Sequence, residues 1–296
     1  PKTPVEDSVI YRLIGRQSDR KVGHISHNDL IKGYEHVFKC LVDFKNNSIS
    51  YITVDTVDEN DLKNVISFIK MTKFSVIWCG SAGLMEFLPS AYGLEQETGR
   101  AAEVPENTNR VLFVIGSVSK SSREQLDELL YCTDTVGIEV KSTEIILNDK
   151  DRKDEWNRIM KKAAGSVNLN KNIAVFSSSE VKKTQKAGME NGYSSIQISN
   201  VISRFLGKIS ACIIDKFKVK SLFVTGGDIA YQVFDNLDAS EFKLLGEVEP
   251  GIPFGMLKNK DKIFAVTKAG SFGSKMAMVK AILVLRGDMV KIIDNN

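Results

Sequence analysis

Apolar segments of strand length alternate with longer stretches of helical periodicity along most of this chain. In the second half, three apolar segments run straight into small residues before a helical stretch begins: VLFVIGSVSKSS (111–122), LFVTGGDIA (222–230) and FAVTKAGSFGS (264–274). This alternation is typical of β-α-β units around a parallel sheet. It therefore predicts an α/β fold with mainly parallel sheets.

The periodicity also places individual elements. In the first part it predicts strands at 21–25, 50–56 and 74–80 and helices at 28–44 and 58–70. In the second part we expect strands at 110–119, 172–178, 221–227 and 262–270, and helices at 122–132, 154–164, 195–217 and 274–285. The segment 244–264, which contains Pro250, Gly251, Pro253 and Gly255, is interpreted as a rigid crossing loop between strands.

Residues 89–110 interrupt this pattern, because apolar periodicity gives way to Pro, Gly, Glu and Asn. Such a stretch is typical of a linker. We therefore predict two domains, 1–92 and 110–296, joined by a linker at 93–109, with the ligand cleft between the domains.

Composition narrows the class of protein. The chain has 296 residues, 43% hydrophobic and 26% charged, which is ordinary for a globular protein. Its net charge of +3 is slight and its lysines are dispersed, so the sequence predicts no nucleic-acid partner. Neither a spanning apolar run nor the layout of a secretory signal is present, and we expect a cytoplasmic protein without a membrane partner.

Cysteines and histidines give no metal signal. The four cysteines are far apart without a C-x-x-C motif, and we interpret them as buried free thiols. His24 and His27 lack a third ligand at a usual spacing, so we treat them as surface or core residues. No metal-ligating residue is predicted.

The three strand-end loops carry the candidate site. In an open α/β sheet, ligands bind at the carboxyl ends of the strands, where helix N-termini present amides to anions. Glycine allows close approach to a phosphate, and an aspartate there either caps the next helix or contacts a nucleotide. Each loop also has a simpler explanation as a tight turn, a serine cap or a surface lysine. The candidates are Gly116, Ser117, Ser119, Gly226, Gly227, Asp228, Lys268, Gly270 and Gly273.

Common motifs are absent from the chain. The Walker A pattern G-x-x-x-x-G-K-[ST], the dinucleotide fingerprint G-x-G-x-x-G and the G-x-S-x-G elbow do not occur. The second part contains no histidine, which disfavours triad hydrolysis. An NAD-dependent oxidoreductase is disfavoured for lack of its fingerprint.

Taken in order, GSVSKSSREQ, TGGDIA, EPGIPFG and TKAGSFG resemble the nucleotide-binding domain of the four-carbon acid sugar kinases. The first part, with PKTPV, RQSDRKVGHI, VDTVDENDL and GSAGLMEFLP, resembles the later half of that family's N-terminal sugar-acid-binding domain. The resemblance implies an ATP-dependent kinase that phosphorylates the terminal hydroxyl of threonate, erythronate or a 3-oxo-tetronate.

The resemblance also implies roles for residues. Ser117, the loop Gly226 to Ile229, and Gly270 would contact ATP, with Ser119, Lys268 and Gly273 added as neighbours on physical grounds. Phosphoryl transfer needs positioning and charge neutralisation, which amide-rich loops with Mg²⁺ can supply. Ser81 and Gly83 would line the sugar-acid side, although a turn and a helix start explain Gly80 to Gly83 equally well. The catalytic base and the particular tetronate stay unassigned.

Two departures from the family pattern qualify this reading. Ile229 stands where the family usually has threonine, so only a backbone contact with ATP is expected there. The family's D-D-x-T-G-A motif and the basic segment that helps to hold the sugar acid do not occur in these residues. We therefore expect a piece of a longer protein, with a companion N-terminal fragment or a homo-oligomer as possible partners. The alternative is a non-catalytic nucleotide- or metabolite-binding regulatory protein of the same fold.

Overall fold

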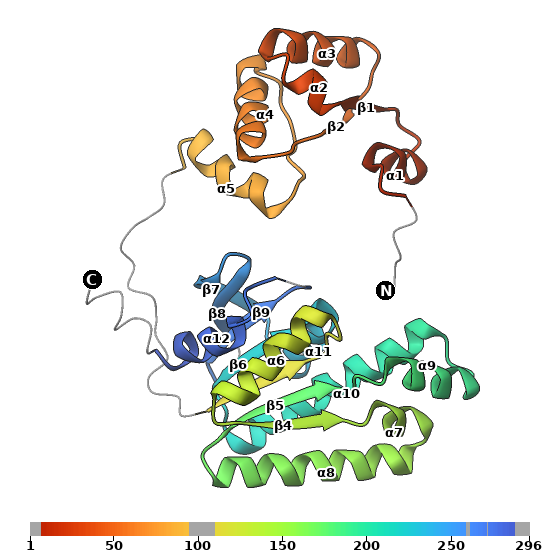
Figure 1. Cartoon of the computed structure of the whole chain (residues 1–296), viewed down its shortest axis with the longest axis vertical. Coiled ribbons are helices and arrows are strands. Elements are labelled where there is room, and N and C mark those ends of the chain that lie inside the picture. The colour runs from red at the N-terminus through yellow and green to blue at the C-terminus, as the bar shows by residue number, and fades with distance from the viewer. Residues whose placement is uncertain (1–6, 95–109, 259–260, 271, 288–296) are drawn as a thin grey trace. The chain divides into compact units, whose positions relative to one another are not determined.

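The structure is a computed structural model that describes residues 7–94, 110–258, 261–270 and 272–287 (Figure 1). The chain divides into two compact units, Pro1–Arg100 and Ala101–Asn296. Both units mix helices with mainly parallel strands, which confirms the predicted fold class. The predicted linker falls mostly outside the described residues, so its boundaries stay a prediction.

The first unit contains a small parallel sheet covered by helices. Strands β1 (Val22–Ile25) and β2 (Tyr51–Val54) pair in parallel. Leu30, Val37, Leu41 and Val65 form its core together with Ile25 of β1. The helices are α1 (Ile10–Gln17), α2 (His27–Leu30), α3 (Tyr34–Asn46), α4 (Glu59–Thr72) and α5 (Ala82–Ala91).

Local chemistry explains where these helices begin. Asp58 accepts a hydrogen bond from the Asp61 amide and caps α4. The single helix predicted at 28–44 is wrong: Gly33 adopts φ 89°, a conformation open to glycine, and separates α2 from α3. The strand predicted at 74–80 is also wrong. Within the described residues it joins no sheet, and Ile77 in its middle is 99% exposed.

The second unit is built on a seven-stranded sheet. Its order is β4 (Thr135–Val140), β5 (Asn172–Ser177), β3 (Val111–Ile115), β6 (Ser221–Thr225), β9 (Ile263–Lys268), β8 (Ile252–Lys258) and β7 (Glu241–Glu249). The first five are parallel, and β8 runs antiparallel to both β9 and β7. Every residue of β3 and β6 is buried, as expected for parallel strands covered on both faces.

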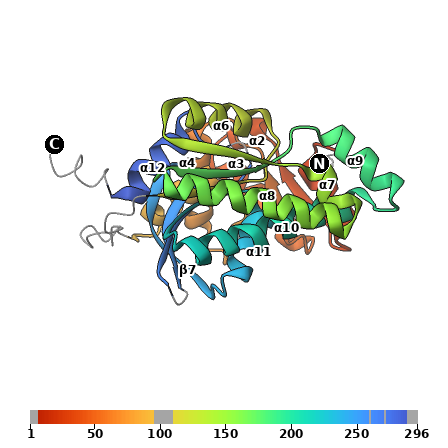
Figure 2. The same ribbon diagram turned by 90° about the horizontal axis from the view of Figure 1, so that it is seen from below.

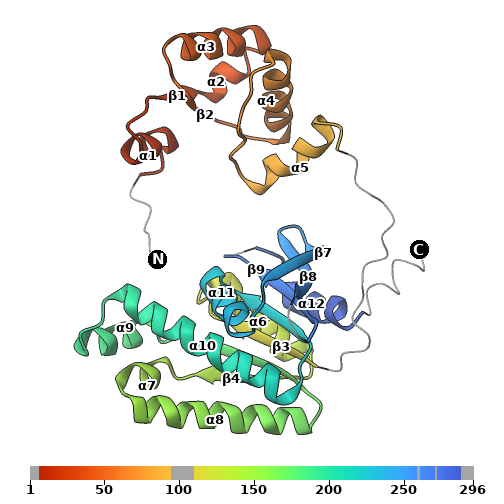
Figure 3. The ribbon, with the colours of Figure 1, turned by 180° about the vertical axis from the view of Figure 1, so that it is seen from behind.

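Helices cover both faces of this sheet. One face packs against α6 (Lys120–Cys132) and α12 (Ala277–Arg286) through a core around Phe113 and Phe223. The other face packs against α7 (Ser142–Leu147), α8 (Asp149–Asn168), α10 (Ser195–Phe217) and α11 (Gly227–Asn236), and α9 (Val181–Glu190) lies beside α7. Figure 2 shows α6 and α8 on opposite sides of the strands, and Figure 3 shows α10 and α11 from behind.

The crossing loop predicted at 244–264 is mainly an antiparallel hairpin. Strands β7 and β8 pair across a turn at Pro250 and Gly251, and Gly251 has φ 79°. Strand β4 and helices α7 and α9 were not predicted either. Much of β7 is solvent-exposed, so its sequence lacks the continuous apolar run by which the central strands were found.

Two other expectations are decided by the fold. None of the four cysteines is buried, so the prediction of buried thiols is wrong, although all four are free. Among the described residues, no helix combines the length and the apolar character needed to cross a membrane.

Candidate functional site

The predicted loops meet where the chain changes faces of the sheet. Strands β3 and β6 are neighbours, but the helices that follow them, α6 and α11, pack on opposite faces. Their connections therefore diverge at the carboxyl ends of the strands, and open α/β sheets bind ligands at such a position. Hydrogen bonds from the Gly116 amide to the Thr225 carbonyl (3.4 Å) and from the Gly226 amide to the Lys268 carbonyl (3.1 Å) hold the three loops side by side.

The loop after β3 is a chain of hydroxyl groups at the start of α6. Ser117 Oγ donates to Ser119 Oγ (3.1 Å), and Ser119 Oγ donates to Ser122 Oγ (3.1 Å). Ser119 also accepts from the Ser122 amide and so caps α6, as the simpler explanation held. Its hydroxyl is therefore committed to the helix, whereas among the described residues Ser117 Oγ accepts only a long bond (3.4 Å) from the Ser119 amide.

The loop after β6 answers why two glycines follow that strand. Gly226 occupies the cap position of α11 with φ 101°, a conformation that favours glycine. Gly227 begins the helix; its N–H has no acceptor within the described ranges, and a Cβ there would meet nothing within 4 Å. Asp228 lies in the first turn, so the cap position that we considered for it belongs to Gly226.

Ile229, in the first turn of α11, belongs to the core of the second unit. Its side chain is buried in the core, and a Cβ on Gly116 would lie 1.5 Å from Ile229 Cδ1. The Ile229 amide donates to the Gly226 carbonyl at 3.1 Å. Gly116 is thus required by packing against Ile229, while Gly227 keeps open space above the first turn.

The loop after β9 contains a buried cation. Lys268 is 2% exposed, which contradicts its alternative reading as a surface lysine, and Nζ donates to the Gly270 carbonyl (2.7 Å). Burial lowers the pKa of Lys268. Gly270 has φ 53°, and Gly273, at φ 87°, packs so closely that a Cβ would lie 2.4 Å from Ile252 Cδ1. Gly273 therefore has a packing role.

Two polar side chains that sequence reasoning missed fix this last loop. Gln125 of α6 is 1% exposed, and its Nε2 donates to the carbonyls of Phe272, Gly273 and Ser274. Glu249, at the hairpin turn, accepts from the Ser274 amide and hydroxyl (2.6 Å each) and from Lys280 Nζ (2.7 Å). Gln125 ends the segment GSVSKSSREQ and Glu249 begins EPGIPFG, but sequence reasoning assigned neither residue a role because their contacts become visible only in the folded chain.

A second cation lies at the carboxyl end of β5. Arg123 Nη2 donates to the Ser177 carbonyl (2.7 Å), and Ser177 Oγ donates to the Gly116 carbonyl (3.1 Å). Burial lowers the pKa of Arg123, although nearby acidic residues act against it. Arg123 thus connects α6 to the base of the loop after β3.

Glu249 makes the loop after β9 sensitive to acid. Burial alone would raise its pKa, but hydrogen bonds from Lys280 and Ser274 outweigh this and lower it. A lowered folded-state pKa means that the stabilisation is complete above the ordinary value of 4.5 and is lost as pH falls through the folded value. We expect Glu249→Gln to lower the free energy of unfolding by about 1 kcal/mol at neutral pH. Thermal unfolding across acidic pH checks this, since wild type should lose stability more steeply than the variant; parallel curves would contradict it.

The predicted sugar-acid residues lie in the first unit. Ser81 precedes α5 without a side-chain capping bond, and Gly83 lies in the first turn of that helix. A Cβ on Gly83 would touch Leu62 Cδ1 at 3.4 Å, which is ordinary packing. A role for either residue in substrate binding stays a prediction.

The histidines of the first unit pair with aspartates. His24 Nε2 lies 3.3 Å from Asp55 Oδ2, and His27 Nε2 lies 3.1 Å from the buried Asp61. His36 lies 3.0 Å from Asp29. Within the part of the chain that is described, no group of three histidine, cysteine or acidic side chains is placed to hold a metal ion.

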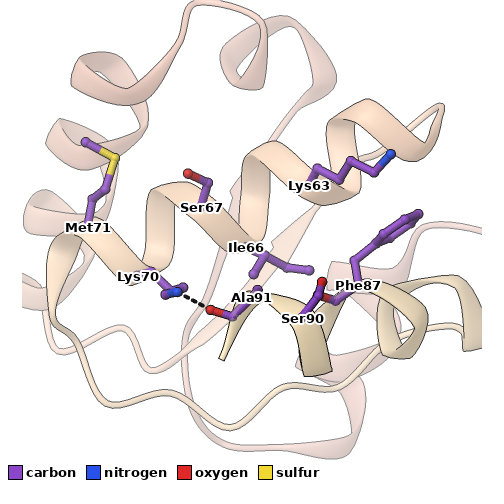
Figure 4. A pocket seen from close by; sticks show the side chains of 8 residues that line it. All are labelled: Lys63, Ile66, Ser67, Lys70, Met71, Phe87, Ser90 and Ala91. Carbon is purple, nitrogen blue, oxygen red and sulfur yellow. Dashed lines mark hydrogen bonds between the residues drawn. The ribbon is translucent and has the colours of Figure 1, made fainter. Parts of the chain in front are cut away.

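A cavity of about 500 Å³ lies between α4 and α5 of the first unit (Figure 4), and its lining includes neither Ser81 nor Gly83. It is lined by residues between Lys63 and Met71 and between Phe87 and Ala91. Lys70 donates to the Ala91 carbonyl at its floor, and Lys63 lies over the Phe87 ring at 4.7 Å. Because both ammonium groups already have partners, the cavity offers little unpaired charge to a ligand.

Comparison with known proteins identifies both units. Residues 112–278 match the description of a nucleotide-binding C-terminal domain, and residues 1–88 match that of a sugar-binding N-terminal domain. The fold therefore belongs to the class of two-domain proteins that these two descriptions define together. The chain is a member of the four-carbon acid sugar kinase family.

The named relatives are distant. A D-threonate kinase of Salmonella typhimurium is 26% identical over 95% of this chain, and a 3-oxo-tetronate kinase of Haemophilus influenzae is 22% identical over 93%. The chain spans 65% and 63% of the length of these two relatives.

Two solved structures share the fold. One is described as a putative tRNA synthase of Salmonella typhimurium, with 19% identity and a TM-score of 0.69. The match covers 95% of this chain and 64% of the Salmonella chain. The other is a Haemophilus influenzae protein of the DUF1537 family, with 22% identity and a TM-score of 0.60. The match covers 96% of this chain and 66% of the Haemophilus chain.

Proposed function

We propose that this chain contributes the nucleotide site of an ATP-dependent kinase that phosphorylates the terminal hydroxyl of a four-carbon sugar acid. The observation that carries the proposal is the meeting of three amide- and hydroxyl-rich loops, which backbone hydrogen bonds from Gly116 to Thr225 and from Gly226 to Lys268 hold side by side. Such a group of loops suits a triphosphate because N–H groups and a cation can neutralise its charge without covalent chemistry.

The residues fit a nucleotide with its magnesium ion. Gly227 offers an unpartnered N–H within the described residues, Ser117 offers a hydroxyl, and Lys268 offers charge. When bound, ATP supplies the phosphoryl group, and Mg²⁺ carried on its phosphates neutralises their charge. The chain's own residues would hold the phosphates in line and limit access of water to them. We keep Ser119, Asp228, Ile229, Gly270 and Gly273 as proposed neighbours of the nucleotide.

The sugar acid would bind to the first unit, with Ser81 and Gly83 as candidate contacts. Threonate, erythronate and 3-oxo-tetronate are the substrates in the names of the relatives, and we propose this class without choosing among them. Exclusion of water from the transferred phosphoryl group would limit wasteful hydrolysis of ATP.

The proposal is tested by measuring ADP release from the full chain with ATP, Mg²⁺ and each of the three sugar acids. Turnover that depends on one sugar acid supports the kinase. ATP binding without turnover would favour the non-catalytic nucleotide-binding alternative. Absence of ATP binding would contradict both. Intact-mass analysis of the purified protein shows whether a companion polypeptide accompanies the chain.

A further inference from the structure

Lys268 is a buried ammonium group without a carboxylate partner among the residues that the structure describes. It is 2% exposed, and its one hydrogen bond there goes from Nζ to the Gly270 carbonyl at 2.7 Å. An ammonium group carries three N–H donors, and taking it out of water is unfavourable unless hydrogen bonds or an opposite charge offset the loss. Lys268 therefore has donor capacity and positive charge that its protein contacts do not use.

Thr225 is a second underused polar group beside it. Thr225 and Lys268 are register partners on β6 and β9, so both side chains project from the same face of the sheet, the α6 side. Thr225 is fully buried, and its Oγ1 has no hydrogen-bond partner in the described ranges. An unpaired buried hydroxyl is unfavourable and calls for an explanation.

Both groups lie at the carboxyl ends of their strands, Thr225 as the last residue of β6 and Lys268 as the last of β9. The Lys268 carbonyl accepts from the Gly226 amide, so the lysine backbone adjoins the first turn of α11. Gly270, whose carbonyl holds Nζ, is exposed. Water can therefore take over that carbonyl when the long lysine side chain turns away from it.

We infer that Lys268 and Thr225 form a subsite for the phosphate chain of the nucleotide, which Lys268 reaches by exchanging the Gly270 carbonyl for a phosphate oxygen. The inference rests on the proposed function and deepens it. Phosphate oxygens accept hydrogen bonds, and Lys268 and Thr225 both have donors to give. The competing explanation is a purely structural clamp, in which Lys268 serves only to hold the loop after β9.

The affinity test compares Lys268→Met and Thr225→Val with the surface control Lys258→Met in the full chain. Lys258 is the last residue of β8 and pairs with Glu241 in solvent. It lies near the start of β9, whereas Lys268 is at the end of β9. Calorimetric titration should show ATP affinity reduced about tenfold or more by Lys268→Met and about threefold by Thr225→Val, with the control unchanged. Adenosine, which lacks phosphate, should bind all four proteins equally. ATP binding by Lys268→Met at wild-type strength would overturn the inference.

Thermal unfolding without ligand separates the subsite from the clamp. Lys268→Met removes a buried charge and Thr225→Val removes an unpaired hydroxyl, so neither should lower the melting temperature of the free protein. A structural clamp predicts the opposite for Lys268→Met, and a clear loss of stability in that variant would overturn the inference.

Inorganic triphosphate is the probe that distinguishes failure of the subsite from failure of the proposed nucleotide function. Binding of triphosphate that depends on Lys268, without binding of ATP, would keep the subsite and reject the nucleotide function. Equal ATP binding by wild type and Lys268→Met would keep the nucleotide function and reject the subsite. If wild type bound neither compound, both proposals would be wrong.

Discussion

Replacing Gly227 by valine should abolish ATP binding, a loss of at least about a hundredfold in affinity, while the free protein stays folded. Gly227 has an ordinary negative φ, and an added Cβ would meet no atom within 4 Å, so the fold can accept a side chain there. That open space is the space that phosphates would occupy above the first turn of α11. Calorimetric titration measures the affinity, and circular dichroism measures the fold.

Gly165→Val is the matched control. Gly165 is another helical glycine with open space around its Cβ position, but it lies on the exposed surface of α8. The Gly165→Val variant should bind ATP like the wild type, with a small gain in helix stability. Retention of full ATP affinity by Gly227→Val would remove this loop from the proposed site, and a loss caused by both variants would point to a general effect of the substitution.

Replacing Arg158 by methionine should lower the free energy of unfolding by about 3 kcal/mol. Glu155 is 1% exposed, and Arg158 binds both of its oxygens at 2.6 Å. Without Arg158 the buried carboxylate keeps one described hydrogen bond, from the Lys141 amide. Removal of one partner from a buried ion pair leaves an uncompensated charge, and denaturant unfolding measures the cost.

Lys183→Met is the control for this prediction. Lys183 and Glu180 form an ion pair with the same spacing, but both are largely exposed, so a loss below about 0.5 kcal/mol is expected. Glu155→Gln added to Arg158→Met removes the stranded charge and should restore part of the stability. A double variant no more stable than Arg158→Met would show that packing of the arginine stem, rather than charge, causes the loss.

The central strands could be predicted from the sequence because each of them is a run of consecutive apolar residues. β3, β5, β6 and β9 are apolar runs buried on both faces, and a continuous run is visible without knowledge of its neighbours. The segment 74–80 has the same appearance, yet it joins no sheet among the described residues. An apolar run indicates that a segment is suited to a strand. Whether the segment pairs depends on a neighbouring strand with free backbone N–H and C=O groups.

The three loops of the candidate site could also be predicted, since parallel strands bring their carboxyl ends to one edge. The role of each residue in these loops could not be predicted. Gly273 and Ile229 prove to be packing residues, and the burial of Lys268 gave no signal in the sequence. The contacts of Gln125 and Glu249 join segments far apart in the chain, so they exist only after the sheet has formed.

The position of β3 has a consequence for synthesis of the protein on the ribosome. It is the first strand of its sheet to be made and lies near the centre, between β5 and β6. Its five buried residues must wait for β5, which follows α6, β4, α7 and α8, and then for β6 beyond the long helix α10. A nascent chain that stalls before β6 is made therefore presents β3 with one edge unpaired, and such intermediates depend on chaperones to avoid aggregation.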